Sequence, residues 1–419
     1  MTDEAQRARW SLAIAALTMA IQNGIVMAFA VLYLPLIQEF GGSRADVAVV
    51  QSAVLLLGGF SGPAIGYALD RLGPRRLFQG GALLAALGLV LASGAAGLPF
   101  LLLTYGLMAG LGLAALGSQP NMVVAALWYP GARGRAIAVA DLGTGFGAFL
   151  FIPLAQMLVA RYGWRATLVV WAALLVALLI PANAFQRLPS FPVAAHGTMR
   201  PAGGQASGSP SQDRVEWTIS SAARARAFWW LVAVRFFSAV AFPLMNVHLV
   251  AFAVGAGISP GRGAAALGTV SLVSLGGRLL TGWLADWLGR APTLTLTYAS
   301  AVVGIGHLAL LTSTGWPGWL IGYVLFYGLA QGSGGIVTAA RVADIFAGVS
   351  FGTIYGWIVL ATGPGEGLGA WAGGAIFDLT GSYLWAFGLV VLVLLAGIGA
   401  IWQVSPPPQA GGPPARRST

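Results

Sequence analysis

Long apolar stretches alternate with short polar segments along almost the whole chain. The first begins near Trp10 and continues past Leu36, which is longer than the roughly 7–15 apolar residues of a signal peptide. About 20 apolar residues suffice to cross a bilayer as a helix. Twelve such spans follow one another, at 11–37, 47–69, 77–97, 100–127, 135–160, 166–187, 227–254, 263–285, 292–312, 317–342, 351–377 and 384–402. Backbone polar groups in hydrocarbon must be satisfied within the segment, so the pattern predicts an all-α membrane protein.

The polar segment in the middle of the chain divides these twelve spans into two sets of six. Residues 188–225 are rich in Pro, Gly and Ser and cannot bury enough apolar area to fold alone. We therefore expect a six-helix bundle over 1–187, a flexible cytoplasmic linker over 188–225 and a second bundle over 226–402. The proline-rich, basic segment 403–419 is expected to be a disordered cytoplasmic tail, with a ligand for a proline-recognition domain as the alternative.

Composition agrees with a membrane location and excludes several classes of protein. Hydrophobic residues make up 58% of the chain and charged residues 8%, against about 25% charged residues in soluble domains. The sequence contains no lysine, which argues against ATP-driven pumping through a Walker motif and against Schiff-base chemistry. It contains no cysteine, and its three histidines lack metal-ligand spacing, so we expect no metal, no cofactor and no enzymatic activity.

The net charge of +10 reports membrane topology and does not indicate a nucleic-acid partner, because the arginines lie in short segments between apolar runs. If the N-terminus is cytoplasmic, sixteen arginines fall on the cytoplasmic side and four outside. This positive-inside bias predicts that both termini are cytoplasmic. The arginine- and alanine-rich composition favours the cell inner membrane of a bacterium.

A repeated motif relates the two halves. The stretch from Gly66 to Arg76 reads GYALDRLGPRR, and GWLADWLGR begins at Gly282, so that Asp70 and Asp286 lie 216 residues apart. The motif resembles the signature of major facilitator superfamily transporters, which implies two pseudo-symmetric six-helix bundles. Ion pairs and helix-end dipoles can latch the cytoplasmic side there, with anchoring by arginine as the alternative. The expected cytoplasmic gate consists of Asp70, Arg71, Arg75, Arg76, Asp286 and Arg290.

Four further strings narrow the resemblance. They are WYPGARGRAIAVADLGTGFG at 128–147, PLAQMLVARYGWR at 153–165, VADIFAGVSFGTIYG at 342–356 and GGAIFDLTGSY at 373–383. Their order and spacing resemble the monocarboxylate transporter branch and the related bacterial oxalate/formate antiporters. The resemblance implies a monomer that works by alternating access and carries a small organic anion, often with a proton.

Arg278 is the strongest candidate for an anion site, because it lies well inside the predicted span 263–285. A charge there costs about 2.5–3.5 kcal/mol or more, and a guanidinium matches a carboxylate bidentately. Ser271, Ser274 and Arg278 recur at spacings of three and four, which places them on one helix face. Resemblance to the family also assigns the substrate carboxylate to this arginine. The alternatives are an ion pair with Asp286 or another helix, or snorkelling to the surface.

Three other titratable residues are candidates for substrate or proton contacts. His248 is placed against the bound anion by the resemblance, and the alternative is a packing histidine. Glu366, near the middle of the eleventh span, can carry the proton, pair with Arg278 or Arg235, or contact an amine or hydroxyl of the cargo. Asp141 is a second acid for proton coupling, although a local pair with Arg133 or Arg135 is favoured.

Polar residues within the spans complete the expected substrate site. Helices 1, 4, 7 and 10 line the cavity in this superfamily, which is an implication of the fold. The predicted contacts besides Arg278, His248 and Ser274 are Tyr327, Gln331, Asn121, Gln119, Asn23 and Thr362.

The sequence thus predicts a carrier in which a monocarboxylate such as lactate or pyruvate docks on Arg278 and a proton accompanies it. The bilayer and the small anion are the expected partners. Two alternatives remain: an exchanger of oxalate-like anions, which the single convincing deep arginine disfavours, and drug or cation efflux centred on Glu366.

Overall fold

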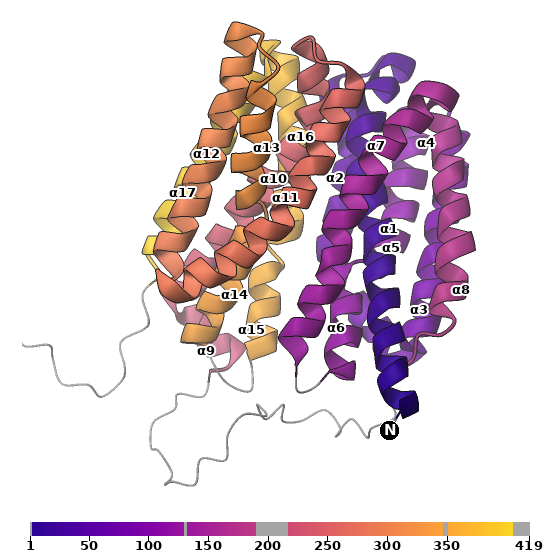
Figure 1. Ribbon diagram of the computed structural model, residues 1–419, viewed down its shortest axis with the longest axis vertical. Coiled ribbons are helices and arrows are strands. Elements are labelled where there is room, and N and C mark those ends of the chain that lie inside the picture. The colour runs from indigo at the N-terminus through magenta and orange to yellow at the C-terminus, as the bar shows by residue number, and fades with distance from the viewer. Residues whose placement is uncertain (1, 130–131, 190–216, 347–350, 405–419) are drawn as a thin grey trace, which may run out of the picture.

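The computed structural model describes residues 2–129, 132–189, 217–346 and 351–404, and all regular structure within these ranges is helical (Figure 1). The first half contains α1 (Thr2–Phe40), α2 (Arg44–Phe60), α3 (Gly62–Ser93), α4 (Leu98–Leu101), the π-helical stretch η1 (Leu102–Ala109), α5 (Gly110–Ala115), α6 (Ser118–Trp128), α7 (Arg133–Leu174), η2 (Leu175–Leu179) and α8 (Ile180–Asn183). The second half contains α9 (Ile219–Arg224), α10 (Arg226–Gly255), α11 (Pro260–Trp287), α12 (Arg290–Thr314), α13 (Trp319–Ala330), α14 (Ser333–Ile345), α15 (Phe351–Val359), α16 (Thr362–Thr380) and α17 (Tyr383–Trp402).

These helices make twelve membrane crossings, as the sequence predicts. Nine stretches of the described residues are individually long and apolar enough to cross a membrane. One of them, Gly62–Ser93, holds the end of the second crossing, which α2 begins, and all of the third; another, Arg135–Asn183, holds the fifth and sixth. The helices α15 and α16 together form the eleventh. The predicted linker falls largely in 190–216 and the predicted tail largely in 405–419, outside the described residues.

Turn glycines show that the two halves repeat the same backbone plan. Gly41, Gly73 and Gly163 have φ of 62°, 75° and 80°, and Gly257, Gly289 and Gly381 have φ of 81°, 92° and 71°. The offsets between matching glycines are 216, 216 and 218 residues. Glycine is the residue that adopts this left-handed region without a Cβ penalty. The chain therefore turns at equivalent places in both halves, which form the two bundles side by side in Figure 1.

Small residues let α1 and α7 of the first bundle approach each other closely. A Cβ on Gly143 or Gly147 of α7 would collide with the carbonyl groups of Ala16 and Ala20 on α1. Lipid tails are as apolar as leucine, so helix association in a membrane depends on such close van der Waals packing. The DLGTGFG segment is thus a packing surface.

Four crossings are interrupted near their middle. The second breaks at Ser61, the fourth at Leu116–Gly117, the tenth at Gln331–Gly332 and the eleventh at Leu360–Ala361. The predicted spans run through all four places, although a glycine lies at or within two residues of each break, at Gly62, Gly117, Gly332 and Gly363, where local sequence allows an interruption. Irregular backbone at membrane depth occurs where it is buried in protein or lines a cavity.

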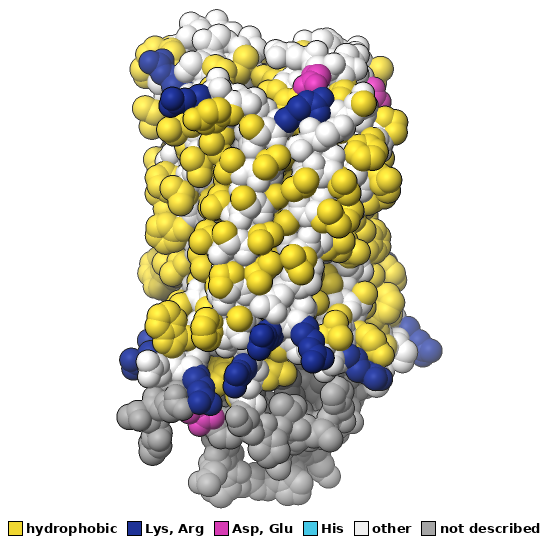
Figure 2. All heavy atoms as spheres, turned by 90° about the vertical axis from the view of Figure 1, so that its right-hand side faces the viewer, with side chains coloured by type: hydrophobic (Ala, Val, Ile, Leu, Met, Phe, Trp, Pro, Cys, Tyr) yellow, Lys and Arg dark blue, Asp and Glu magenta, His cyan; other side chains and the backbone are white. Residues whose placement is uncertain are grey.

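The outer surface matches a membrane-embedded bundle. Figure 2 shows a broad belt of hydrophobic side chains with charged side chains above and below it. Exposed apolar side chains on the membrane-crossing helices include Leu87, Leu103, Leu150, Ile321 and Leu392. Dark blue arginines gather mostly at the lower end, where α1 begins and α17 ends (Figures 1 and 2). We call this end of the bundle the terminal end, and the other the opposite end.

Candidate functional site

A cavity of about 800 Å³ lies between the two halves. Helices α6 and α14 and the start of α7, which border it, lie toward the terminal end in Figure 1. The polar residues that line it are Gln22, Asn23, Gln51, Ser118, Gln119, Asp141, Arg235, Ser238, Asn246, Arg278, Gln331, Tyr355, Thr362 and Glu366. Both halves contribute to this set, so a bound molecule would contact both.

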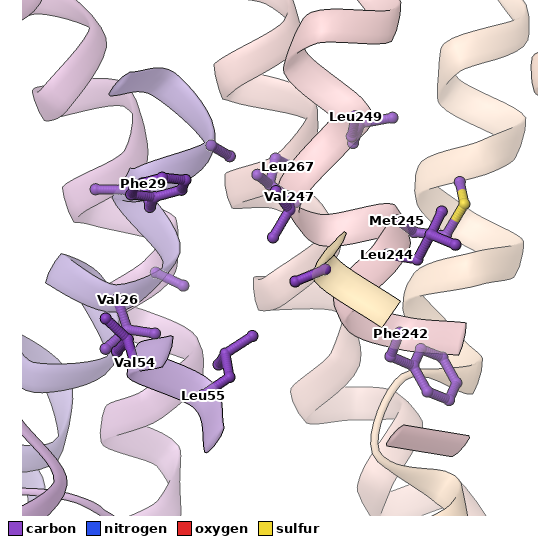
Figure 3. Close-up of a cluster of buried hydrophobic side chains, with 14 of the residues drawn as sticks. Val26, Phe29, Val54, Leu55, Phe242, Leu244, Met245, Val247, Leu249 and Leu267 are labelled. Carbon is purple, nitrogen blue, oxygen red and sulfur yellow. The ribbon is translucent and has the colours of Figure 1, made fainter. Parts of the chain in front are cut away.

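Apolar side chains from both halves also line the cavity. Val26, Val54 and Leu55 come from the first half, and Phe242 and Val247 come from the second. Figure 3 shows them on facing helices of the two bundles. A molecule bound beside the charged residues would therefore also meet apolar surface.

Arg278 on α11 forms an ion pair with Asp141 on α7. The Arg278 and Asp141 side chains remain 28% and 23% exposed, which leaves them accessible from the cavity. Arg278 Nη1 also lies 3.4 Å from Thr144 Oγ1, and Arg278 Nε is buried without a hydrogen-bond partner. Asp141 thus pairs with Arg278 across the two halves, where the sequence favours a local pair with Arg133 or Arg135. No described ion pair links Arg278 to Asp286, which pairs with Arg290 instead.

A second arginine faces the same cavity. Arg235 on α10 donates from Nη2 to Thr362 Oγ1 of α16 at 3.2 Å. Glu366, four residues after Thr362, lines the cavity and forms no described ion pair or side-chain hydrogen bond. The described residues therefore do not show the pairing of Glu366 with Arg278 or Arg235.

A smaller cavity of about 160 Å³ adjoins the Arg278–Asp141 pair. Asn23, Ser274 and Gln331 line it. Asn23 donates to the Thr144 carbonyl oxygen at 2.8 Å, and Ser274 donates to its own helix at the Ser271 carbonyl oxygen. The structure thus brings together Arg278, Asp141, Asn23, Ser274 and Gln331, while Gln119, Thr362 and Glu366 line the larger cavity.

Three predicted substrate contacts do not line either cavity in this conformation. Tyr327 is fully buried and stacks on Tyr323 at 4.9 Å, because α12 and α13 pack tightly there. Asn121 donates to the Leu116 and Gly117 carbonyl oxygens, both at 2.9 Å, and so satisfies acceptors that the helix break exposes. His248 is 1% exposed, and its Nε2 lies 2.8 Å from the Ala370 carbonyl oxygen.

At the opposite end, contacts between the halves close the bundle. The Asp378 carboxylate accepts hydrogen bonds from the backbone N–H groups of Arg44 and Ala45, at 3.0 and 2.7 Å. These two residues begin α2, so a carboxylate of the second half caps a helix of the first. The Arg44 guanidinium lies 3.6 Å from the ring centre of Phe377.

His248 belongs to this closure. Its ring meets Tyr33 of the first half edge-on, with centroids 5.0 Å apart. Its Nδ1 lies 3.3 Å from the Tyr383 hydroxyl, which accepts a hydrogen bond from Arg44. The histidine is therefore a contact between the halves in this conformation.

Replacing Asp378 with asparagine should open the opposite end. The two carboxylate oxygens of Asp378 each accept one backbone N–H, whereas asparagine has a single amide oxygen. Losing a hydrogen bond costs the closed conformation roughly 1–3 kcal/mol. The population of the conformation that is open at this end should therefore rise about fivefold or more. Spin labels at exposed Phe100 and Trp316 would report the separation, since the chain has no cysteine. Asp46→Asn is the matched control, because Asp46 caps α2 from within its own half. Unchanged distances in Asp378→Asn would contradict the closure role.

The two copies of the repeated motif differ in their contacts. Arg290 pairs with Asp286 at 2.7 Å and with Asp344 of α14 at 3.1 Å. Asp70 is exposed and forms no ion pair within the described residues, and Arg71, Arg75 and Arg76 are also exposed. The second-half copy is thus tied to its own bundle, while the first-half copy faces outward.

Arg235 lines the cavity, although its position in the sequence does not predict this. Arg235 lies near the start of its helix, where a surface-directed side chain is expected. A periodic signal nevertheless identifies its face: Arg235, Ser238, Phe242 and Asn246 recur at spacings of three and four, and all four line the cavity. Such a stripe on an otherwise apolar helix predicts a shared face. No metal-binding group of three or more His, Asp and Glu side chains occurs in the described part of the chain.

A twelve-helix bundle of two repeated halves around a central charged cavity defines a membrane carrier. The sequence profile described as Major Facilitator Superfamily matches residues 12–336. This match covers most of the chain, which therefore belongs to the major facilitator superfamily of transporters.

Curated relatives and solved structures agree with this family. The chain is 29% identical over 390 residues to monocarboxylate transporter 13 of Bos taurus, covering 91% of this chain and 85% of that protein. It is 28% identical to monocarboxylate transporter 3 of Rattus norvegicus, with 90% and 75% covered. A bacterial homologue of the human lysosomal transporter Spinster, in an inward-facing and unoccupied conformation, shares the fold with a TM-score of 0.66, 15% identity and 95% of both chains covered. The resemblance to the monocarboxylate transporter branch is thus confirmed.

Proposed function

We propose that this transporter moves a small monocarboxylate of the lactate or pyruvate type together with a proton, by alternating access. The observation that carries the proposal is the Arg278–Asp141 ion pair, which spans the two halves inside the cavity. A carboxylate of the cargo offers Arg278 the same acceptor atoms as Asp141. Cargo binding would then release Asp141 from Arg278 and change a bond between the halves.

The charge balance favours a proton as companion. Arg278 and Asp141 are neutral as a pair, and a bound anion adds one negative charge to a cavity within the bilayer. A proton taken up by Asp141 or by Glu366, which also faces the cavity, removes that excess, which is costly at membrane depth. In this proposal, His248 acts when the opposite end opens and its ring separates from Tyr33 of the first half.

We further propose that the carrier acts as a monomer in a bacterial inner membrane with both termini cytoplasmic. The arginine-rich fringe at the terminal end supports this orientation (Figure 2). In that orientation the cavity opens to the cytoplasm, and the closure around Asp378 faces outside.

The gate around Asp70 is expected to form when the terminal end closes. The exposed position of Asp70 in this conformation is consistent with an open gate. Asp70→Asn should lower the transport rate by more than the protein level, about tenfold in rate, because only one of the two states loses an ion pair. Uptake normalised to protein in the membrane checks this. Equal losses of rate and protein would assign Asp70 to folding alone.

Uptake of labelled lactate or pyruvate into proteoliposomes tests the proposed function. Saturable uptake should rise when the outside is acidified and fall when an ionophore dissipates the proton gradient, relative to protein-free liposomes. Uptake that is insensitive to the gradient would remove the proton from the proposal. If lipophilic cations bind in the cavity and carboxylates do not compete with them, cation efflux would be favoured instead.

A further inference from the structure

The proposed function gives one charged cluster of the cavity no contact with the cargo. Arg235, Thr362 and Glu366 lie on α10 and α16, and all three line the cavity. Arg235 donates to Thr362 at 3.2 Å, and Glu366 follows Thr362 by four residues on α16, which places both on one helix face. The Glu366 carboxyl group itself has no hydrogen-bond or ion-pair partner among the described residues. This cluster therefore offers donors and an acceptor to a molecule in the cavity.

The cluster and Arg278 lie on either side of the first turn of α14. A Cβ placed on Gly332 would lie 2.8 Å from Arg278 Nε, and one on Gly335 would lie 3.2 Å from Arg235 Nη1. Gly332 precedes α14 as its cap and Gly335 lies in its first turn, so these two positions are at most about 10 Å apart. Both guanidinium groups also line the same cavity, so one small molecule can contact both sites.

The charges of the cluster discriminate among possible second groups of the cargo. An ammonium group would approach Glu366 but would be repelled by Arg235, and a second carboxylate would be attracted by Arg235 but repelled by Glu366. A methyl group would leave the Glu366 carboxyl without a partner, which is costly for a group in the membrane interior. A hydroxyl group accepts from Arg235 or Thr362 and donates to Glu366.

We propose that Arg235, Thr362 and Glu366 form a second subsite that selects carboxylates carrying a hydroxyl group a few carbon atoms away from the carboxylate. The carboxylate occupies Arg278, and the hydroxyl occupies the cluster beyond the first turn of α14. This inference rests on the proposed function, because it assumes that Arg278 holds the carboxylate. It adds a specificity that Arg278 alone does not supply.

Four acids of equal length test the subsite. Butyrate, 4-hydroxybutyrate, 4-aminobutyrate and succinate share a four-carbon chain and differ only at C4, which is a methyl, a hydroxymethyl, an ammoniomethyl or a carboxylate group. Their dissociation constants are measured by calorimetry on the purified full-length protein in detergent. 4-Hydroxybutyrate should bind roughly tenfold more tightly than butyrate, since one hydrogen bond to a charged group is gained, and the other two acids should bind more weakly than 4-hydroxybutyrate.

Two variants locate the preference. Glu366→Gln and Arg235→Gln should each bring the ratio for 4-hydroxybutyrate over butyrate to within about twofold of unity, with Arg235→Gln also relieving the penalty on 4-aminobutyrate. Glu4→Gln, which removes an exposed carboxylate far from the cavity, should keep the wild-type ratio. Thermal unfolding and gel filtration confirm that each variant is folded.

The outcomes separate this inference from the proposed function. A flat series in the wild type, a preference for succinate, or a hydroxyl preference that survives in both variants would overturn the subsite while leaving a carboxylate site at Arg278. Binding of all four acids that is unaffected by Arg278→Gln would overturn the proposed function. If none of the four acids binds to folded protein, both proposals fail.

Discussion

Arg278→Gln should abolish carboxylate uptake in protein that still folds. Losing one partner of a buried, hydrogen-bonded charge pair costs roughly 2–5 kcal/mol in binding, so affinity for the anion should fall about 30-fold or more. Labelled lactate uptake in proteoliposomes measures the loss. Arg262→Gln is the matched control, because Arg262 is an exposed arginine on the same helix, outside the cavity.

The Arg278 variant also leaves Asp141 without its partner, and an unpaired carboxylate in the bundle can lower stability. The double variant Arg278→Gln with Asp141→Asn removes both charges and restores neutrality. It should be as stable as wild type within about 1 kcal/mol and equally inactive. Uptake retained in either variant would remove Arg278 from the binding site.

Asp141→Asn should separate anion binding from proton-driven accumulation. Without Asp141, no carboxylate of the protein competes for Arg278, so the anion should bind about tenfold more tightly. The empty carrier would then hold an unpaired guanidinium at membrane depth, which is costly to reorient. Net uptake driven by a proton gradient should be lost, while exchange of labelled for unlabelled anion, with the carrier always loaded, should persist.

Calorimetry and counterflow in proteoliposomes measure these two effects of Asp141→Asn. The control is Glu39→Gln, which alters an acid that contacts Trp164 outside the cavity. Gradient-driven accumulation at the wild-type level would exclude Asp141 as the proton carrier and leave Glu366 as the cavity acid to test.

The architecture is predictable from the sequence because each crossing needs about 20 apolar residues and the motif around Asp70 recurs around Asp286. Uninterrupted spans do not hold at the four helix breaks, because hydropathy alone does not register the glycine near each break. Gly59 of α2 approaches the backbone of Gly363 on α16 so closely that a Cβ would collide there. This close contact between the halves lies next to the breaks in the second and eleventh crossings.

The site was predictable only in part. Arg278 stands out because a lone arginine in an apolar helix must have a partner or a function. Its actual partner, Asp141, is 137 residues away in the sequence, and the nearby Arg133 and Arg135 made a local pair the simpler hypothesis. His248 shows a further limit, because sequence does not say which conformation a residue serves. The roles of these residues in transport remain predictions.

The closure at the opposite end depends on backbone N–H groups, which most amino-acid substitutions leave unchanged. Asp378 binds the backbone N–H groups of Arg44 and Ala45, and every residue except proline supplies such a group. A second charge substitution should therefore not compensate for the loss of Asp378. For Arg278 and Asp141, by contrast, both partners are side chains, and a second substitution can restore neutrality. Suppressor screens should return substitutions elsewhere that destabilise the outward-open state, and position 378 should not covary with 44 or 45 among relatives.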